Sequence, residues 1–432
     1  MVELSEYSAW HGTRPMKTAL ENLDSGSFLV EGRGVRVRDQ AGRWYLDGRS
    51  SLWNLTLGHD HPKVISAIRE QLDSLPFGTL LSYGRPPAVS IQFANALAAR
   101  LPAGLRHIRL GNTGSQMTES AVLLSRFFRQ EAGEPRRTAV ISFDGSYHGT
   151  GPCATALSGH LQKAHEWCGP LMDDVHQVPA EGSWHKAVQE QVAALGPDRV
   201  TAVIFEPLMG SVGTIPDPGD LARMVDYCRG QGIHVIADEV TTGYGRIGHL
   251  SRVLQLGIHP DMIVFSKGIT AGYVPGAALA VCDEIFDPLA SAASGRAFIH
   301  GSTTDGHPLA AAAGLAVLEV LYEDGVMDSV AHKSEVLRAA LERVQREFVP
   351  GGEIAGTGLM LKFALRDEQG QTWSREEVNA LHAACEEAGL LVSIAIEGLW
   401  VLPPLVISVQ ECEEIAELMA TALKATLADE LH

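Results

Sequence analysis

The sequence lacks the features that would place it in a membrane, a secretory pathway or a repeat architecture. No stretch approaches the roughly 18 uninterrupted apolar residues of a membrane span. The first ten residues carry Glu3 and Glu6 without an apolar run, so we expect no signal peptide. We find no internal repeat and no low-complexity linker. These absences predict a cytoplasmic protein.

Paired cysteines and positive charge are also scarce. The six cysteines are scattered and form no C-x-x-C pair, which argues against a zinc ribbon or a disulfide framework. Against 52 acidic residues there are only 34 Lys and Arg, and the net charge of −18, which repels phosphate backbones, argues against nucleic acid as a partner. The acidity is typical of a soluble enzyme, and it favours a cationic partner only weakly.

What the chain does have is a regular alternation of apolar runs and amphipathic segments. A hairpin is predicted around residues 35–47, followed by helices at Pro62–Leu75 and Val89–Leu101. Five β-branched or apolar strands then alternate with helices, which predicts an α/β fold with a largely parallel sheet buried on both faces. We place these strands at Arg106–Leu110, Thr138–Phe143, Val200–Phe205, Ile233–Ala237 and Met262–Phe265, with one more at Ala277–Val281.

The last third of the chain has a different pattern. It is helical from His307 to about Phe348, and then mixes strands near Leu359–Ala364, Leu391–Ala395 and Leu399–Leu402 with a helix from Val409. We therefore expect a large domain over residues 61–310. Residues 1–60 and 311–432, from the two chain ends, would form a smaller α+β domain.

Polar residues cluster where the predicted strands end. Glu206, Asp238 and Lys267 each end or follow an apolar strand, and the turn at Gly114 follows another. In an open α/β sheet, ligands bind off the carboxyl ends of the strands. This shared placement predicts the functional site more strongly than any single residue does.

Each strand-end residue allows a chemical and a structural interpretation. Burial would lower the pKa of Lys267 and free a nucleophilic amine, although a lysine at a strand end often only extends to solvent. Asp238 could keep a pyridine nitrogen protonated. Asp238 and Glu239 could also bind a metal, but no His or Cys lies nearby at ligand spacing, so we expect none.

Two loops could hold the rest of a cofactor. The turn Gly111-Asn-Thr-Gly-Ser-Gln opens a helix whose free N–H groups suit a phosphate, or it is a plain capped turn. It matches neither a Walker loop nor a dinucleotide fingerprint. In the segment Ser146-Tyr147-His148-Gly149, the aromatic ring could stack on a planar cofactor or pack on the core.

Together these motifs resemble class III (ornithine/ω-amino acid type) aminotransferases, pyridoxal 5′-phosphate (PLP) enzymes of fold type I. The resemblance runs from about Trp44 to Leu423. The motifs stand in family order: Asn112-Thr-Gly-Ser-Gln, Ser146-Tyr-His-Gly, Phe205-Glu-Pro, Ala237-Asp-Glu-Val-Thr-Thr-Gly-Tyr-Gly-Arg, Phe265-Ser-Lys-Gly and His300-Gly-Ser-Thr-Thr-Asp-Gly-His-Pro. The family fold implies a mostly parallel seven-stranded sheet flanked by helices.

The resemblance also implies a role for each matching residue. Lys267 would be the Schiff-base lysine and proton carrier, and Asp238 would hold the pyridine nitrogen. Thr303 would reach the phosphate of the neighbouring subunit, which implies a homodimer with shared active sites. The other cofactor residues would be Gly114, Ser115 and Gln116 at the phosphate, Tyr147 and Val240 on the ring faces, and His148 and Glu206 nearby. Trp53, Tyr83, Arg85, Glu206 and Trp400 would contact substrate.

The sequence departs from the family at the substrate end. Many members carry an Arg before the Pro-Pro segment to bind a carboxylate, whereas this chain reads Gly398-Leu-Trp-Val-Leu-Pro-Pro and has no Arg after Arg375. Glu206, the usual partner of that Arg, would be left without it. We therefore predict a substrate with extra amino groups or hydroxyls, such as an amino sugar, with Arg85 as a substitute carboxylate clamp.

The predicted reaction is ping-pong amino transfer from an amine donor to an aldehyde or ketone acceptor. One rival keeps the fold and PLP but changes the outcome to an aminomutase, an epimerase or a carbon–carbon bond-forming enzyme. Another is a binding protein that retains the fold without catalysis.

Overall fold

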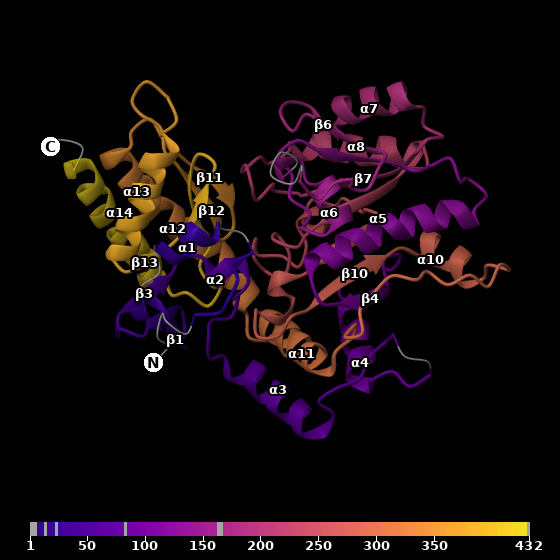
Figure 1. Cartoon of the computed structure of the whole chain (residues 1–432), viewed down its shortest axis with the longest axis horizontal. Coiled ribbons are helices and arrows are strands. Elements are labelled where there is room, and N and C mark those ends of the chain that lie inside the picture. Colours follow the sequence, from indigo (N-terminus) through magenta and orange to yellow (C-terminus); the bar gives the residue numbers. More distant parts are fainter. Residues whose placement is uncertain (1–6, 13–14, 22–24, 82–83, 162–166, 430–432) are drawn as a thin grey trace.

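The computed structural model describes residues 7–12, 15–21, 25–81, 84–161 and 167–429. Figure 1 shows two lobes: one contains α12, α13 and α14, and the other contains the strands from β4 to β10 with their helices. Within the described residues, no helix is long and apolar enough to cross a membrane.

A seven-stranded sheet forms the centre of the larger lobe. Its order is β4-β10-β9-β8-β7-β5-β6. The strands from β9 to β6 run parallel, while β10 runs antiparallel to both β4 and β9. The strands are β4 (His107–Gly111), β5 (Ala139–Phe143), β6 (Val175–Val178), β7 (Val200–Phe205), β8 (His234–Asp238), β9 (Met262–Phe265) and β10 (Ala277–Val281).

Helices cover this sheet because its strands are buried along their whole length. Every residue of β5, β7, β8, β9 and β10 is buried, so both faces need apolar cover. α5 packs on β7, β9 and β10, and α11 packs on α3 and α4. The helices of this lobe are α3 (Pro62–Ser74), α4 (Ala88–Ala98), α5 (Gly114–Glu131), α6 (Pro152–Leu157), α7 (Trp184–Leu195), α8 (Pro218–Gly230), α9 (Arg252–Gln255), α10 (Asp283–Ala290) and α11 (Pro308–Glu323).

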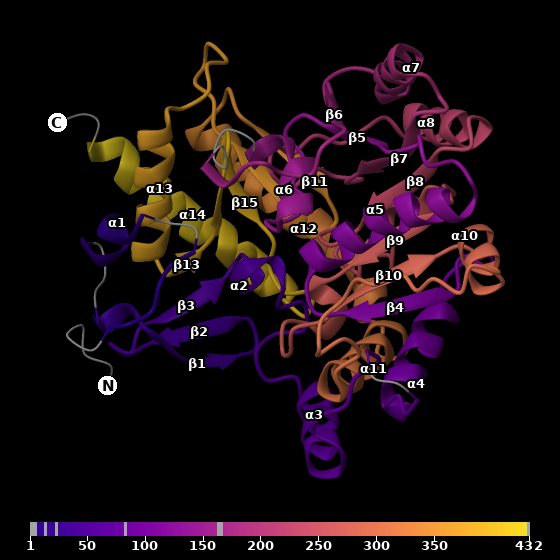
Figure 2. The ribbon, with the colours of Figure 1, turned by 45° about the vertical axis from the view of Figure 1, so that its right-hand side comes forward.

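The smaller lobe is built from both ends of the chain. One sheet has the order β1-β2-β3-β13 and the other the order β11-β12-β15-β14, so chain segments more than 300 residues apart meet in one sheet (Figure 2). The strands are β1 (Leu29–Arg33), β2 (Arg36–Asp39), β3 (Trp44–Asp47), β11 (Glu353–Thr357), β12 (Met360–Ala364), β13 (Leu390–Leu391), β14 (Ser393–Ala395) and β15 (Gly398–Val401). The helices are α1 (Met16–Glu21), α2 (Ser50–Trp53), α12 (Val326–Phe348), α13 (Arg375–Glu387) and α14 (Val409–Asp429), with a short 3-10 turn at Ser25–Ser27. Two further 3-10 turns, at Gly159–Leu161 and Lys267–Thr270 (η5), belong to the larger lobe.

The predicted α/β class and the large buried sheet are confirmed, and the differences are local. The helical stretch predicted from His307 to Phe348 is two helices, because Gly325 takes a left-handed conformation (φ +70°) between α11 and α12. The strand predicted at Leu391–Ala395 is shared between β13 and β14, which belong to different sheets. The short strands β1, β6 and β11 were not predicted. The domain boundaries at residues 60 and 310 stay a prediction.

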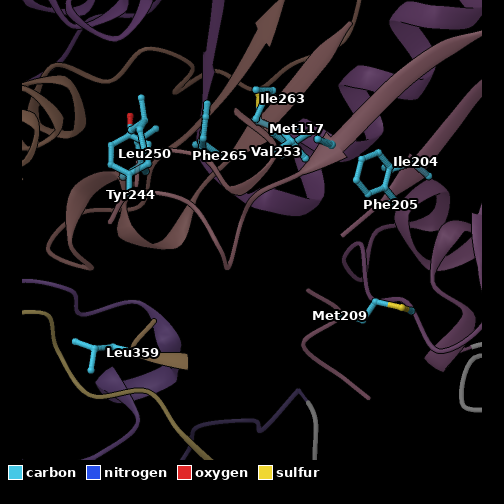
Figure 3. Close-up of a cluster of buried hydrophobic side chains, with 14 of the residues drawn as sticks. Met117, Ile204, Phe205, Met209, Tyr244, Leu250, Val253, Ile263, Phe265 and Leu359 are labelled. Atoms are coloured by element: carbon cyan, nitrogen blue, oxygen red, sulfur yellow. The ribbon is translucent and has the colours of Figure 1, made fainter. Parts of the chain in front are cut away.

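The core beneath the strand ends is closely packed. Figure 3 shows Phe265 of β9 near Tyr244, and their rings meet edge to face at 5.5 Å between centroids. Tyr244 is 1% exposed and Phe265 is fully buried. This packing fixes the end of β9, from which the next residues enter the functional site.

A buried histidine at the start of β8 makes stability depend on pH. His234 Nδ1 lies 2.8 Å from Ser125 Oγ, and burial, helped by Arg129 and Arg137, lowers the pKa of His234 to about 3. In the unfolded chain its pKa is about 6.5. The stabilising difference is therefore complete above that value and is lost as the pH falls towards the folded pKa.

We expect a His234→Gln variant to lose part of the acid sensitivity of the wild type. Each pH unit between about 6 and 4 costs the wild type about 1.4 kcal/mol of unfolding free energy through this group. Urea midpoints measured across that range check the expectation. His259→Gln is the matched control, because His259 is exposed, and it is expected to keep the acid sensitivity of the wild type. Equal pH slopes for wild type and His234→Gln would contradict the account.

Candidate active site

A cavity of about 160 Å³ lies at the carboxyl ends of the sheet strands. It brings together the strand-end residues that the sequence predicted, Glu206, Asp238 and Lys267, with the loops after β4 and β5. Its lining is Gly114, Ser115, Tyr147, His148, Gly149, Glu206, Asp238, Val240, Thr241, Ser266 and Lys267. A larger hollow of about 730 Å³ lies between α3, α4 and α11, but it contains none of the predicted site residues, so chemistry favours the smaller cavity.

Lys267 opens η5 directly after β9 in a strained conformation. Its φ is +42°, in the left-handed region that side chains other than glycine rarely adopt. Its Nζ donates a hydrogen bond to Thr241 Oγ1 at 2.7 Å and lies 5.4 Å from the centre of the Trp53 ring. Burial lowers the pKa of Lys267 although Asp238 and Glu206 oppose this. Such an amine is easily made neutral and nucleophilic.

Asp238 ends β8 with its carboxylate held from two sides. His148 Nδ1 lies 2.8 Å from Asp238 Oδ2, and the Val240 N–H donates to Asp238 Oδ1 at 3.1 Å. Asp238 is 4% exposed and His148 is 2% exposed. A carboxylate fixed in this way at the cavity wall can accept a further proton donor, which is the geometry that a protonated pyridine nitrogen needs.

Glu206 follows β7 and does not stand alone. Its two carboxylate oxygens accept the backbone N–H groups of Tyr147 at 2.9 Å and Gly210 at 3.2 Å. Burial raises the pKa of Glu206 to about 7, an effect that Asp238 increases and His148 opposes. The sequence left this carboxylate without its Arg. In the structure, backbone amides supply the partners, which a sequence pattern cannot reveal.

The turn before α5 has the form of an anion site. Thr113 caps the helix by accepting the Gln116 N–H, and Gly114 and Ser115 line the cavity. A Cβ on Gly114 would stand 3.0 Å from Val240 Cγ2, so any larger residue would require the Val240 side chain to shift. Gln116 does not line the cavity. Its Nε2 donates to Asp305 Oδ1 at 2.7 Å, and its Oε1 accepts the Asn112 N–H at 2.9 Å.

Tyr147 and Val240 lie on the cavity wall with the strand-end groups. Tyr147 is 40% exposed, and its position is fixed through its N–H, which donates to Glu206. Val240 packs against Gly114 and follows Asp238 by two residues. Both residues are therefore available to a flat ligand between β8 and the loop after β5.

The two tryptophans predicted for the substrate pocket lie against each other. Their rings meet edge to face at 5.9 Å, and Trp53 Nε1 donates to Ser393 Oγ at 3.0 Å. Trp53 has φ +61°, a second strained residue beside the cavity. Trp400 is 1% exposed, and Leu208, Met360, Ala395 and Leu402 surround it. Trp400 is thus a wall behind Trp53, not a surface open to the cavity.

Two other predicted residues lie away from this cavity. Arg85 is exposed, shortly before α4, and does not line the cavity. Thr303 is exposed in the loop before α11 and does not line the cavity of its own chain. Tyr83 lies outside the described residues.

Two residues that sequence reasoning missed complete the surroundings. Thr241 binds Lys267 Nζ, and its place one residue after Val240 was the available signal. Lys362 of β12 pairs with Trp400 of β15, is 5% exposed, and donates to Val212 O at 3.1 Å, with Glu397 Oε2 at 3.6 Å. No sequence signal placed Lys362 there, because its position depends on strand pairing. Among the described residues, no cluster of His, Cys, Asp and Glu could hold a metal ion.

Comparison with known proteins agrees with this site. A family model, aminotransferase class-III, matches residues 20–423. An adenosylmethionine-8-amino-7-oxononanoate aminotransferase from Nitratidesulfovibrio vulgaris is 34% identical, over 98% of this chain and 82% of its own. A crystal structure of an (S)-enantioselective ω-transaminase from Thermomicrobium roseum superposes with a TM-score of 0.91 at 30% identity, covering 98% of this chain and 97% of that one.

A PLP-bound amine transaminase from an uncultivated Pseudomonas species is also similar, with a TM-score of 0.89 and 28% identity over 99% of this chain and 100% of that one. Fold and site together define a PLP-dependent transferase of fold type I. The chain belongs to the class III aminotransferase family, and the predicted family, enzyme class and cofactor are confirmed.

Proposed function

We propose that this enzyme transfers amino groups by ping-pong chemistry, with PLP held in the strand-end cavity and joined covalently to Lys267. The observation that carries the proposal is the convergence on one cavity of Lys267, Asp238 and the N-terminus of α5. PLP, when bound, supplies an electron sink that stabilises negative charge on the substrate carbon.

The residues of the cavity fit PLP by their chemistry. The first turn of α5, with Gly114 and Ser115, offers backbone N–H groups and a positive helix end to the phosphate. The Asp238 carboxylate would hold the ring nitrogen, while His148 fixes that carboxylate in place. Val240 and Tyr147 would cover the two ring faces.

Lys267 would also move the proton during the reaction. Because burial lowers its pKa, Nζ can be released as a neutral amine and then take a proton from the substrate carbon and return it. Thr241 Oγ1, which accepts a hydrogen bond from Lys267 Nζ, would orient the free amine between these two proton transfers. Trp53 would shield this region from solvent.

We further propose a homodimer in which Thr303 reaches the neighbouring subunit's phosphate. Thr303 is exposed and does not line the cavity of its own chain, and Ile299, four residues earlier, is 93% exposed. Phe77 packs against His307 and Leu81 lies beside Gly301, both at this loop, and these two side chains are 50% and 53% exposed. A second copy of the chain would bury these apolar side chains. The cytoplasmic location also stays a prediction.

For the substrate, we propose an amine that carries a second amino group or hydroxyls, such as an amino sugar. Of the residues that the structure describes, no arginine lines the cavity, whereas the carboxylates of Glu206 and Asp238 do. Glu206 lies next to Gly210, against which Trp53 packs, so its charge is near the proposed substrate end. Arg85 is exposed and does not line the cavity in the chain described, which weakens its candidacy as a carboxylate clamp.

We expect Glu206→Gln to lower kcat/KM for a diamine donor about tenfold more than for a monoamine of the same length, the size of one charge-assisted hydrogen bond. The monoamine controls for general damage to the site, because both donors need the same chemistry. Steady-state kinetics with the two donors give the ratio. An equal loss for both, or a wild type that strongly prefers short dicarboxylates, would refute the proposed substrate class.

A further inference from the structure

The loop that carries Thr303 (residues 300–307) is held against the turn that opens α5 in the same chain (residues 111–116, called the phosphate turn below) by one buried carboxylate. Asp305 is 4% exposed. Its Oδ1 accepts hydrogen bonds from Gln116 Nε2 at 2.7 Å and from Asn112 Nδ2 at 3.1 Å. Its Oδ2 lies 3.5 Å from Arg109 Nη2. Three side chains, from β4, the turn after it and the first turn of α5, therefore meet on one loop residue.

The same side chains hold other parts of the loop. Asn112 Nδ2 also donates to Ser302 Oγ at 2.9 Å, and Arg109 also donates to the His300 carbonyl. Within the loop, the Asp305 N–H donates to Ser302 O at 3.0 Å, and Asp305 O accepts the Leu80 N–H at 2.8 Å. Residues on both sides of Thr303 are thus fixed, while Thr303 itself stays exposed.

Burial makes this arrangement energetically important. A buried carboxylate is stable only when donors satisfy it, and removing its charge weakens the hydrogen bonds that Gln116 and Asn112 donate to it and its attraction to Arg109. Gln116 stands in the phosphate turn but points its side chain away from the cavity. Its side chain is therefore committed to the loop.

We propose that Asp305 is a positioning residue that makes the phosphate turn of one subunit and the Thr303 loop a single rigid unit, and that Gln116 acts on the cofactor through Asp305. This inference rests on the proposed function, because Thr303 reaches a neighbouring site only in the dimer. The consequence is that each subunit's loop tunes how tightly its partner holds PLP. The turnover number at saturating PLP depends on the Thr303 loop much less than the PLP affinity does.

The test measures PLP dissociation constants by titrating cofactor-free protein, together with kcat at saturating PLP and the melting temperature. Asp305→Asn is expected to weaken PLP binding about tenfold, as the loss of one charge-assisted hydrogen bond does, with kcat nearly unchanged. Asp220→Asn is the matched control, because Asp220 is 7% exposed, accepts from Ser183 Oγ at 2.7 Å and does not line the cavity.

A double-variant cycle separates the role of Gln116 from direct phosphate binding. If Gln116 acts through Asp305, then adding Gln116→Ala to Asp305→Asn weakens PLP binding no further. An additive loss would overturn that assignment. Gln116→Ala alone, a milder change than Asp305→Asn, still tests the inference if Asp305→Asn fails to fold: unchanged PLP affinity would refute it.

Two other results would also contradict the inference, and they are distinguishable. Wild-type PLP affinity in Asp305→Asn, or a loss matched by Asp220→Asn at equal melting temperature, would refute the positioning role while leaving the proposed function intact. A wild-type protein that sediments as a monomer under the conditions in which it binds PLP and is active would refute the shared site itself, and the inference with it.

Discussion

A Lys267→Ala variant is expected to lose transamination activity by about 10³-fold or more, the size of lost proton transfer, and to release PLP on gel filtration. Lys267 would supply both the covalent link to the cofactor and the proton carrier. No other lysine lines the cavity of the described chain, so nothing replaces these two functions. Steady-state rates and the colour of the protein after gel filtration measure the two losses separately.

Lys333→Ala is the matched control for this change. Lys333 is also partly buried, and its Nζ donates to the Leu405 carbonyl at 2.7 Å in the smaller lobe, away from the cavity. We expect the control to keep both colour and activity. A Lys267→Ala variant that remains yellow through gel filtration and keeps measurable turnover would contradict the assignment.

The second large effect is expected for Asp238→Asn, which should lower kcat about 10²- to 10³-fold, the usual cost of removing one electrostatic stabiliser. An amide cannot keep the pyridine nitrogen protonated, so the electron sink weakens. The amide also disturbs the contact with His148 Nδ1. Because Lys267 is intact, the variant should stay yellow, which distinguishes it from Lys267→Ala.

Glu239→Gln tests whether the position of the charge matters. Glu239 is fully buried beside Asp238, but its Oε1 accepts from Ser251 Oγ at 2.8 Å and from the Val253 N–H at 2.8 Å, on the side away from the cavity. We expect Glu239→Gln to lower stability while kcat stays within a few fold of the wild type. Equal losses of kcat in the two variants would contradict the role of Asp238.

The strand-end residues could be predicted from sequence because a parallel sheet brings the carboxyl ends of its strands to one edge. Glu206, Asp238 and Lys267 are each placed by the apolar run before them, and they meet as expected. The same logic does not reach side chains that turn away from the edge. Gln116 lies in the predicted turn, yet its partner is Asp305, nearly 190 residues later.

Contacts that depend on which strands pair, or on backbone conformation, were also beyond sequence reasoning, because a strand pattern does not show its partner. Trp53 depends on a left-handed backbone and on Ser393, 340 residues away. Lys362 lies beside Trp400 only because β12 pairs with β15. The break at Gly325 shows the opposite case, because one glycine with positive φ was a local signal that the helical periodicity around it obscured.

The central claim is amino transfer, and a half-reaction tests it most directly. Purified PLP-loaded protein is mixed with an amine donor and no acceptor, and the products are followed by absorbance and mass spectrometry. The account predicts that the yellow colour fades as one carbonyl product forms per subunit, and that an added aldehyde restores the colour while taking up the nitrogen. Turnover that continues without an acceptor and leaves the nitrogen on a rearranged product would contradict it.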